Sequence, residues 1–159
     1  MVMRINKRMF ILICLFLFGG FTLGVCGDIP NPDPILKNNM LATLKDEIPD
    51  FVILANDIFG GGKPTPQGLE AAQKTGIKTI IDLRTPIEGT QEEQEVVGNL
   101  GMGYVNIPVI PSSLDDYEVD QVREILADPQ NRPAIIHCSS SGRVLKLWTL
   151  YKNKYEDKE

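Results

Sequence analysis

The stretch PAIIHCSSSGRVLKLW, residues 133–148, decides the fold. Its first five residues form an apolar run that favours a buried β-strand. From Gly142 onward, large apolar side chains recur at the spacing of one helix face, at Val144, Leu147, Trp148, Tyr151 and Tyr155. Cys138 is therefore expected between the end of a strand and the N-terminus of a helix.

This position of Cys138 predicts a site that favours negative charge. Free amide hydrogens and the positive end of the dipole at a helix N-terminus stabilise a thiolate and attract an oxyanion. The connecting loop consists of small residues that let successive N–H groups point inward, namely Ser139, Ser140, Ser141 and Gly142. Arg143 can add two N–H donors for an anion. The alternative is an ordinary turn with a buried Cys138 and a solvated Arg143.

His137 is the only histidine in the chain and ends the predicted strand. Its ring could tune the neighbouring thiolate, or it could hydrogen-bond backbone as structural support, which is the commoner role at the end of a buried strand. With one histidine and few cysteines, the sequence predicts no metal site. Residues 60–63, GGGK, lack the context of a dinucleotide-binding loop, so no cofactor is expected.

Strand and helix patterns alternate outward from the central stretch. Strands are predicted over residues 51–54, 77–83, 104–109 and 133–137, and residues 60–63 are interpreted as a turn. Helices are predicted from Pro66 to Gly76 with Thr65 as N-cap, from Thr90 to Gly101 with a Thr90–Glu93 capping box, over residues 114–127, and from Gly142 onward. This alternation predicts an α/β fold with one domain, in which helices flank a mostly parallel sheet.

Residues 1–27 have the layout of an export signal, because three basic residues precede an apolar run over residues 9–18. Cleavage before Asp28, lipid attachment at Cys26 and an uncleaved membrane anchor all remain open. Each places the domain outside the cytoplasm, in the periplasm or the medium, with the membrane contacted only through this segment. Residues 28–50 contain four prolines and predict a loose lead-in, so the folded domain is expected over residues 51–159.

The charge and the cysteines narrow the function further. Without residues 1–27 the chain keeps 13 basic and 21 acidic residues, a net charge of −8. This acidity argues against nucleic acid or an anionic membrane surface as a partner. Cys138 would then be the only thiol of the mature domain apart from Cys26 at its border, and an unpaired thiol in an oxidising compartment is exposed to oxidation unless it has a role.

The order His-Cys, small-residue loop and Arg, between a strand and an amphipathic helix, resembles the protein tyrosine and dual-specificity phosphatase superfamily. Residues 65–69 (TPQGL), 76–84 (GIKTIIDLR) and 103–109 (GYVNIPV) resemble a bacterial branch related to the phosphatase domains of beta-lactamase-hydrolase-like proteins. The likeness covers about residues 55–151. It implies a dual-specificity-phosphatase-like fold and a hydrolase acting on a phosphorylated protein or a small anionic ester.

By this resemblance, Cys138 is the nucleophile that forms a phosphocysteine and Arg143 holds the phosphoryl oxygens. The resemblance also implies an aspartate that protonates the leaving oxygen. Asp115 and Asp116 are the candidates, although either could instead cap the helix that begins near residue 114.

Asp82 and Arg84 end a neighbouring predicted strand, at the same edge of the sheet as Cys138. They could line the site, or they could simply pair with surrounding structure. We rank them below the loop residues as candidates.

The sequence departs from the phosphatase pattern in its loop. Cys138 and Arg143 are separated by four residues instead of five, a spacing that resembles rhodanese-type sulfurtransferases, where the cysteine carries a persulfide. Ser141 stands where a glycine is usual and would strain the loop at a positive φ, and Val144 replaces a supporting hydroxyl. The chain ends soon after Tyr151, so a closing helix is expected to be missing. A member that binds anions without catalysis is therefore a further alternative.

Overall fold

The computed structural model describes residues 34–156, so the predicted export signal over residues 1–27 lies outside the described residues. Five strands form one sheet in the order β1 (Val52–Ala55), β2 (Ile58–Gly61), β5 (Ala134–His137), β3 (Thr79–Asp82) and β4 (Gly103–Asn106). Only β1 and β2 pair antiparallel, and the other neighbours pair parallel. The predicted α/β fold with a mostly parallel sheet is confirmed.

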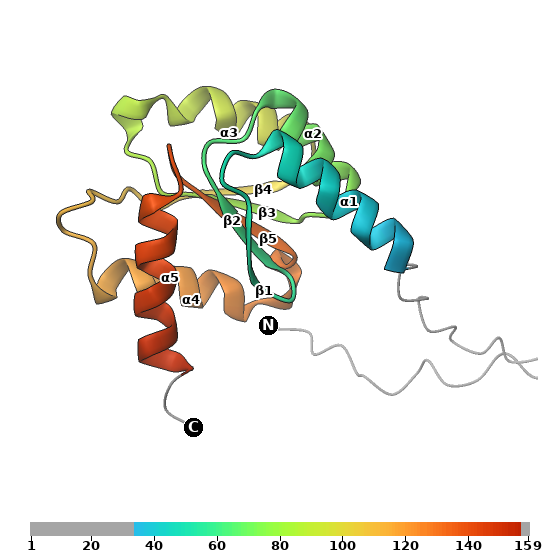
Figure 1. Cartoon of the computed structure of the whole chain (residues 1–159). Helices are drawn as coiled ribbons and strands as arrows, with labels where there is room; N and C mark the ends of the chain where they lie inside the picture. The colour runs from blue at the N-terminus through green and yellow to red at the C-terminus, as the bar shows by residue number, and fades with distance from the viewer. Residues whose placement is uncertain (1–33, 157–159) are drawn as a thin grey trace, which may run out of the picture. The chain divides into compact units, whose positions relative to one another are not determined.

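Helices cover both faces of this sheet (Figure 1). One face carries α1 (Pro34–Glu47), α2 (Pro66–Lys74) and α3 (Thr90–Asn99), and the other carries α4 (Asp116–Ala127) and α5 (Gly142–Tyr155). Successive strand residues point to opposite faces, so Ile135 joins the core under α1 to α3, whereas Ile136 joins the core under α4 and α5. No helix in residues 34–156 is long and apolar enough to cross a membrane.

Helix α1 corrects the predicted domain boundary at residue 51. Residues 28–50 include α1 and are not a loose lead-in throughout, because Leu44 and Ile48 are each only 1% exposed. Both side chains pack in the core with residues of α2 and α3. The folded domain therefore begins no later than residue 34, since prolines at both ends of this segment bound a helix instead of preventing one.

The interpretation of residues 60–63 as a turn is wrong, because Gly60 and Gly61 belong to the strand β2 beside β5. A Cβ on Gly60 would lie 2.8 Å from Cγ1 of Val144, and one on Gly61 would lie 2.6 Å from Cγ2 of Ile48. The two glycines thus let α5 and the end of α1 approach opposite faces of one strand. The glycines serve close packing here instead of a turn.

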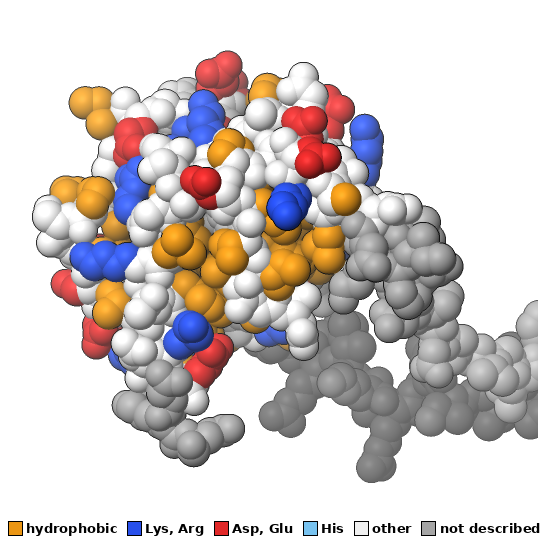
Figure 2. All heavy atoms as spheres, viewed as in Figure 1, with side chains coloured by type: hydrophobic (Ala, Val, Ile, Leu, Met, Phe, Trp, Pro, Cys, Tyr) orange, Lys and Arg blue, Asp and Glu red, His pale blue; other side chains and the backbone are white. Residues whose placement is uncertain are grey.

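The edge strand β1 is less covered than the interior strands. Figure 2 shows hydrophobic side chains gathered in the middle of the face drawn in Figure 1. On β1, Ile53 is more than half exposed. The buried strands β2, β3 and β5 instead position the residues that follow them at the carboxyl edge of the sheet.

Candidate active site

Cys138 directly follows the central strand β5 and is buried. Its N–H donates to the carbonyl of Gly61 at 3.3 Å, and the carbonyl of His137 accepts from the N–H of Leu83 at 2.8 Å. Helix α5 begins four residues later at Gly142. The thiol therefore lies at the carboxyl edge of the sheet and at a helix N-terminus, as predicted.

The loop after Cys138 is tightly constrained at Ser141. Its φ is +62°, in the left-handed region that costs a residue with a Cβ about 1–2 kcal/mol. The positive φ is the condition under which Ser141 was expected to strain the loop. The side-chain hydroxyl donates to Asp50 Oδ2 at 3.2 Å, which ties the loop to the turn after α1.

The predicted nest of inward-pointing amides is incomplete. The N–H of Gly142 donates to the carbonyl of Ser140 at 2.8 Å, so it is already engaged within the loop. Ser140 also forms a bridge to Gly62 beside the loop. The shorter spacing therefore leaves fewer amides for an anion than a nest of the whole loop would offer.

Arg143 is not in solvent but inserted among the loops at this edge, with a side chain that is 10% exposed. Its Nη1 donates to the carbonyls of Leu83 and Val109 at 3.2 and 3.1 Å, and its Nη2 donates to the hydroxyl of Ser139 at 3.0 Å. The carboxylate of Glu88 accepts from both terminal nitrogens, at 2.9 and 2.6 Å.

The pKa of Arg143 depends on two neighbouring side chains. The hydrogen bond to the carboxylate of Glu88 is the main cause that raises the pKa of Arg143, and the nearby Cys138 side chain adds to it. The structure thus brings Cys138, Ser139 and Arg143 together, as the sequence predicted. It does not leave the outer end of the guanidinium free for an anion, because Glu88 holds it.

Glu88 is a site residue that sequence reasoning missed. Besides Arg143, its carboxylate accepts from the Ser139 hydroxyl at 2.6 Å and from the backbone N–H and hydroxyl of Thr85 at 2.8 and 2.9 Å. These hydrogen bonds, that of Arg143 first, hold the pKa of Glu88 far below its usual range. The available signal was the capping-box spacing of Thr85 and Glu88, which fixes the carboxylate in the loop that follows β3.

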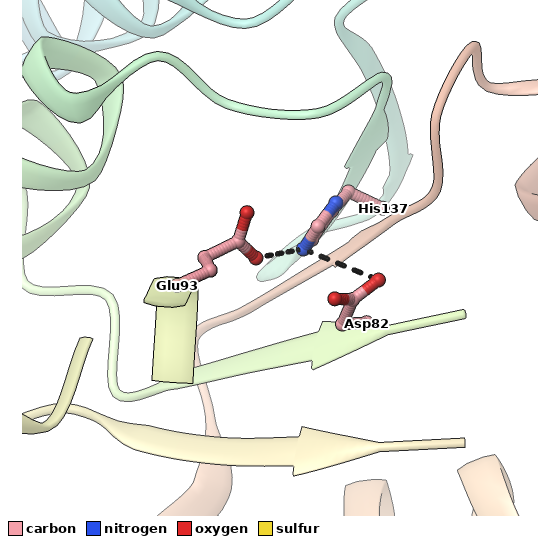
Figure 3. Close-up of side chains that lie close together, drawn as sticks. All are labelled: Asp82, Glu93 and His137. Atoms are coloured by element: carbon pink, nitrogen blue, oxygen red, sulfur yellow. Dashed lines mark ion pairs between the residues drawn. The ribbon is translucent and has the colours of Figure 1, made fainter. Parts of the chain in front are cut away.

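A buried charged network lies behind the loop, formed by Asp82, Arg84, Glu93, Tyr104 and His137. Arg84 Nη2 lies 2.7 Å from Asp82 Oδ2 and 2.9 Å from Glu93 Oε2, and the Tyr104 hydroxyl donates to Asp82 Oδ2 at 2.7 Å. His137 Nε2 lies 2.7 Å from Glu93 Oε1, and Figure 3 shows the ring between the two carboxylates.

Asp82 and Arg84 therefore pair with surrounding structure instead of lining the site. Burial alone would raise the pKa of Asp82, but hydrogen bonds from Arg84 and the charge of His137 lower it overall. The predicted Thr90–Glu93 capping box is wrong, because Gly89 is the N-cap of α3 and the Glu93 side chain points into this network. The sequence feature that could have indicated the buried role of Glu93 is its position four residues before Val97, on the same inward face of the helix.

Three of these side chains have ligand atoms within 4.8 Å of one another, which is the spacing that a metal ion would need: Asp82, Glu93 and His137. Arg84 donates to both carboxylates, however, and Asp82 accepts hydrogen bonds on both oxygens. A guanidinium already supplies the positive charge that two buried carboxylates attract, so these residues do not fit a metal ion well.

Asp115 and Asp116 are held away from Cys138 by other contacts. Asp115 is the N-cap of α4, where its Oδ1 accepts from the N–H of Tyr117 at 2.8 Å. Asp116 Oδ2 lies 3.2 Å from Nζ of Lys154, which follows Arg143 by about 16 Å along the axis of α5. The structure supports the capping alternative for Asp115, and it does not bring Asp116 to the site.

Comparisons with known proteins agree with this geometry. The model of a family described as "DSP-PTPase phosphatase fused to NAD+ Kinase" matches residues 28–154. Two strains of Xylella fastidiosa have a "Beta-lactamase hydrolase-like protein" that is 27% identical over 94 residues, which is 56% of this chain and 22% of the relative. The chain thus spans less than a quarter of the length of these curated relatives.

Solved structures share the fold at lower identity. A DUF442 protein from Shewanella putrefaciens CN-32 superposes with a TM-score of 0.63 at 20% identity, over 73% of this chain and 78% of that one. The core catalytic domain of the PP-IP phosphatase SIW14 from S. cerevisiae gives 0.56 at 19% identity, over 69% and 76%. TpbA of P. aeruginosa, solved in complex with pTyr, gives 0.54 at 17% identity, over 65% and 62%. With its family match over most of its length, the chain belongs to this family of DSP-PTPase phosphatases and is a cysteine-based, PTP-like hydrolase.

Proposed function

We propose that the domain hydrolyses phosphomonoesters through a phosphocysteine at Cys138. The observation that carries the proposal is the position of Cys138 at the carboxyl edge of the sheet and at the N-terminus of α5, with Arg143 in the first turn of that helix, where Glu88 and two carbonyls hold the guanidinium in place. A rigid cation beside a thiol at a helix N-terminus can stabilise both the thiolate and the phosphoryl group that the thiolate attacks.

The reaction has two steps. The Cys138 sulfur forms a bond to phosphorus while the bond from phosphorus to the ester oxygen breaks, and the leaving oxygen takes a proton from water. Water then attacks the phosphocysteine, which releases inorganic phosphate and regenerates the thiolate. The remaining loop amides would hold the phosphoryl oxygens in both steps. Arg143, whose terminal nitrogens donate to Glu88 and to loop oxygens, would stabilise the phosphoryl charge electrostatically.

Aryl phosphates, including phosphotyrosine, are the substrates that suit this site best. Ile87 and Ile110, which are 95% and 57% exposed, directly adjoin Glu88 and Val109, the residues that hold Arg143. They offer an apolar rim for an aromatic ring. An aryl oxygen also leaves readily without a proton donor, and within residues 34–156 neither Asp115 nor Asp116 contacts Cys138 or Arg143.

An aryl phosphate assay on the purified domain tests the proposal. We expect p-nitrophenyl phosphate to be hydrolysed by the unaltered protein, and Cys138→Ser and Arg143→Ala to reduce hydrolysis to background. Mass spectrometry of the acid-quenched protein should show a phosphate adduct on the peptide containing Cys138. Equal inactivity of all three proteins would contradict the proposal.

The four-residue spacing between Cys138 and Arg143 favours a second candidate, sulfur transfer through a Cys138 persulfide. The loop after Cys138 would suit a smaller anion because the Gly142 N–H already donates a hydrogen bond within the loop. Transfer of sulfur from thiosulfate to cyanide, together with a blank phosphatase assay, would favour this candidate. Thermal stabilisation by phosphate with both assays blank would instead indicate an anion-binding member.

We further propose that the domain is exported. The support is the basic and apolar layout of residues 1–27, followed by a region whose acidic residues outnumber its basic ones. Fractionation of bacterial cells that express the full chain, with N-terminal sequencing of the product, should find the domain outside the cytoplasm. Recovery of the intact chain in the cytoplasm would contradict export.

A further inference from the structure

The buried network behind Cys138 has one negative charge more than its permanent cation can balance. Asp82 and Glu93 are carboxylates, and Arg84 is the cation that contacts both. Burial and the hydrogen bond to Asp82 raise the pKa of Tyr104, so its phenol stays neutral. Since an unbalanced buried charge is costly, a further positive charge is expected beside Glu93.

His137 is the residue placed to supply that charge, and its ring is completely buried. Its Nδ1 faces the carbonyl oxygen of Cys138 at 3.5 Å. Its Nε2 faces Glu93 Oε1 at 2.7 Å and Asp82 Oδ1 at 3.8 Å, as Figure 3 shows. A carbonyl and a carboxylate can only accept hydrogen bonds, so each ring nitrogen meets an acceptor and both are best satisfied when both carry a proton.

The atoms Nε2 of His137 and Oε1 of Glu93 lie 2.7 Å apart, and neither makes a hydrogen bond to any group in residues 34–156. A metal ion between them would need further ligands. The oxygens of Asp82 already accept from Arg84 and Tyr104, and the second oxygen of Glu93 already accepts from Arg84. A proton needs only these two atoms, so it satisfies the pair better than a metal.

We propose that Glu93 holds His137 as a doubly protonated imidazolium and thereby acts as a positioning residue for Cys138. The Nδ1–H of the imidazolium then anchors the Cys138 carbonyl, and its positive charge lies one residue before the thiol, on the opposite face of the sheet. The inference rests on the proposed function only in treating Cys138 as the reacting group.

Glu93 connects the buried pair to the surface. It borders a groove between α3 and the start of α2, which is lined by Lys63, Pro64, Pro66, Leu69, Glu92 and Val96. The ionisable groups that face the pair are Asp82 from β3, Arg84 after it and Tyr104 from β4, with Lys63 and Glu92 at the groove.

Nitrogen NMR tests the protonation state in the unaltered protein. Because His137 is the only histidine, protein made without a histidine tag and labelled with ¹⁵N-histidine gives a single imidazole. At pH 7 we expect both ring nitrogens to show the chemical shift of protonated nitrogen, and we expect Glu93→Gln to leave one protonated. One unprotonated nitrogen in the unaltered protein would overturn the proposal, whether or not the variant folds.

The reactivity of the thiol tests the positioning role without relying on phosphatase activity. At pH 6 to 7, Glu93→Gln should slow alkylation of Cys138 by iodoacetamide about tenfold, because a neighbouring imidazolium is lost. The two rates should converge at high pH, where both thiols are ionised. Glu92→Gln, one residue away and exposed, is the matched control and should behave like the unaltered protein.

Two results would refute this role of Glu93. A Glu93→Gln variant that folds and keeps the original pH profile of alkylation would show that the carboxylate is only structural. Thermal stabilisation of the unaltered protein by Zn²⁺, absent in Glu93→Gln, would show that the pair holds a metal ion instead of a proton.

Discussion

Replacement of Glu88 by glutamine tests how Arg143 is held. The carboxylate accepts five hydrogen bonds, two from Arg143, one from Ser139 and two from Thr85. A glutamine side chain accepts hydrogen bonds only through its single oxygen. Its NH₂ group would therefore face the N–H and O–H donors at the position of the other carboxylate oxygen. The substitution therefore removes an ion pair and leaves donors unsatisfied.

The expected loss in the free energy of unfolding is about 1–2 kcal/mol at pH 7. Hydrogen bonds to a charged group contribute about 1.5–3 kcal/mol each when buried, but the Glu88 side chain is 30% exposed, and exposed ion pairs contribute about 0–1 kcal/mol. Urea unfolding of both proteins measures the difference. With Arg143 less constrained, kcat/KM for an aryl phosphate should fall about tenfold to a hundredfold.

The difference in stability between the unaltered protein and Glu88→Gln should decrease as the pH falls. The pKa of Glu88 is lowered in the folded protein from an ordinary value of 4.5, so its contribution is complete above pH 4.5 and is lost as the pH falls toward the lowered value. The stability difference between the unaltered protein and Glu88→Gln should therefore shrink as the pH falls from 4.5 to 3.

The control for this experiment is Glu92→Gln, which should change the stability by less than about 0.5 kcal/mol. Two outcomes would refute the reasoning. One is an equal stability of Glu88→Gln and the unaltered protein at pH 7. The other is a stability difference that stays the same from pH 7 to pH 3.

Substitutions at three further positions test the packing and the site. Gly60→Ala should lower the free energy of unfolding by about 1–3 kcal/mol because its Cβ would meet Val144 at 2.8 Å; urea unfolding checks this, and the loss should shrink when Val144→Ala is added. Ser141→Gly should stay within about 1 kcal/mol of the original stability, whereas Ser141→Val should lose about 1–3 kcal/mol at a φ of +62°, and similar melting temperatures would contradict this. Asp116→Asn should keep kcat/KM for an aryl phosphate within about twofold, because Asp116 pairs with Lys154; a hundredfold loss would restore it as the proton donor.

Local patterns in the sequence were sufficient for most elements of the fold. The β-branched run ending at Asp82 and the apolar run ending at His137 became the parallel neighbours β3 and β5. Thr65 caps α2 with Pro66 in its first turn, as predicted. Strand β2 was missed because its two glycines have a low strand propensity, and only packing against Val144 and Ile48 explains them.

The sequence by itself determined the position of Cys138 and Arg143, because a strand, a short loop and a helix place them by local geometry alone. It also determined that Ser141 would be the strained point of the loop. Tertiary structure decided which distant charges meet them. Glu88 and Arg143 are 55 residues apart in the chain, and Glu93 meets His137 only because α3 packs over the edge where β3 and β5 end. Such contacts depend on the order of strands in the sheet, which no local pattern of residues encodes.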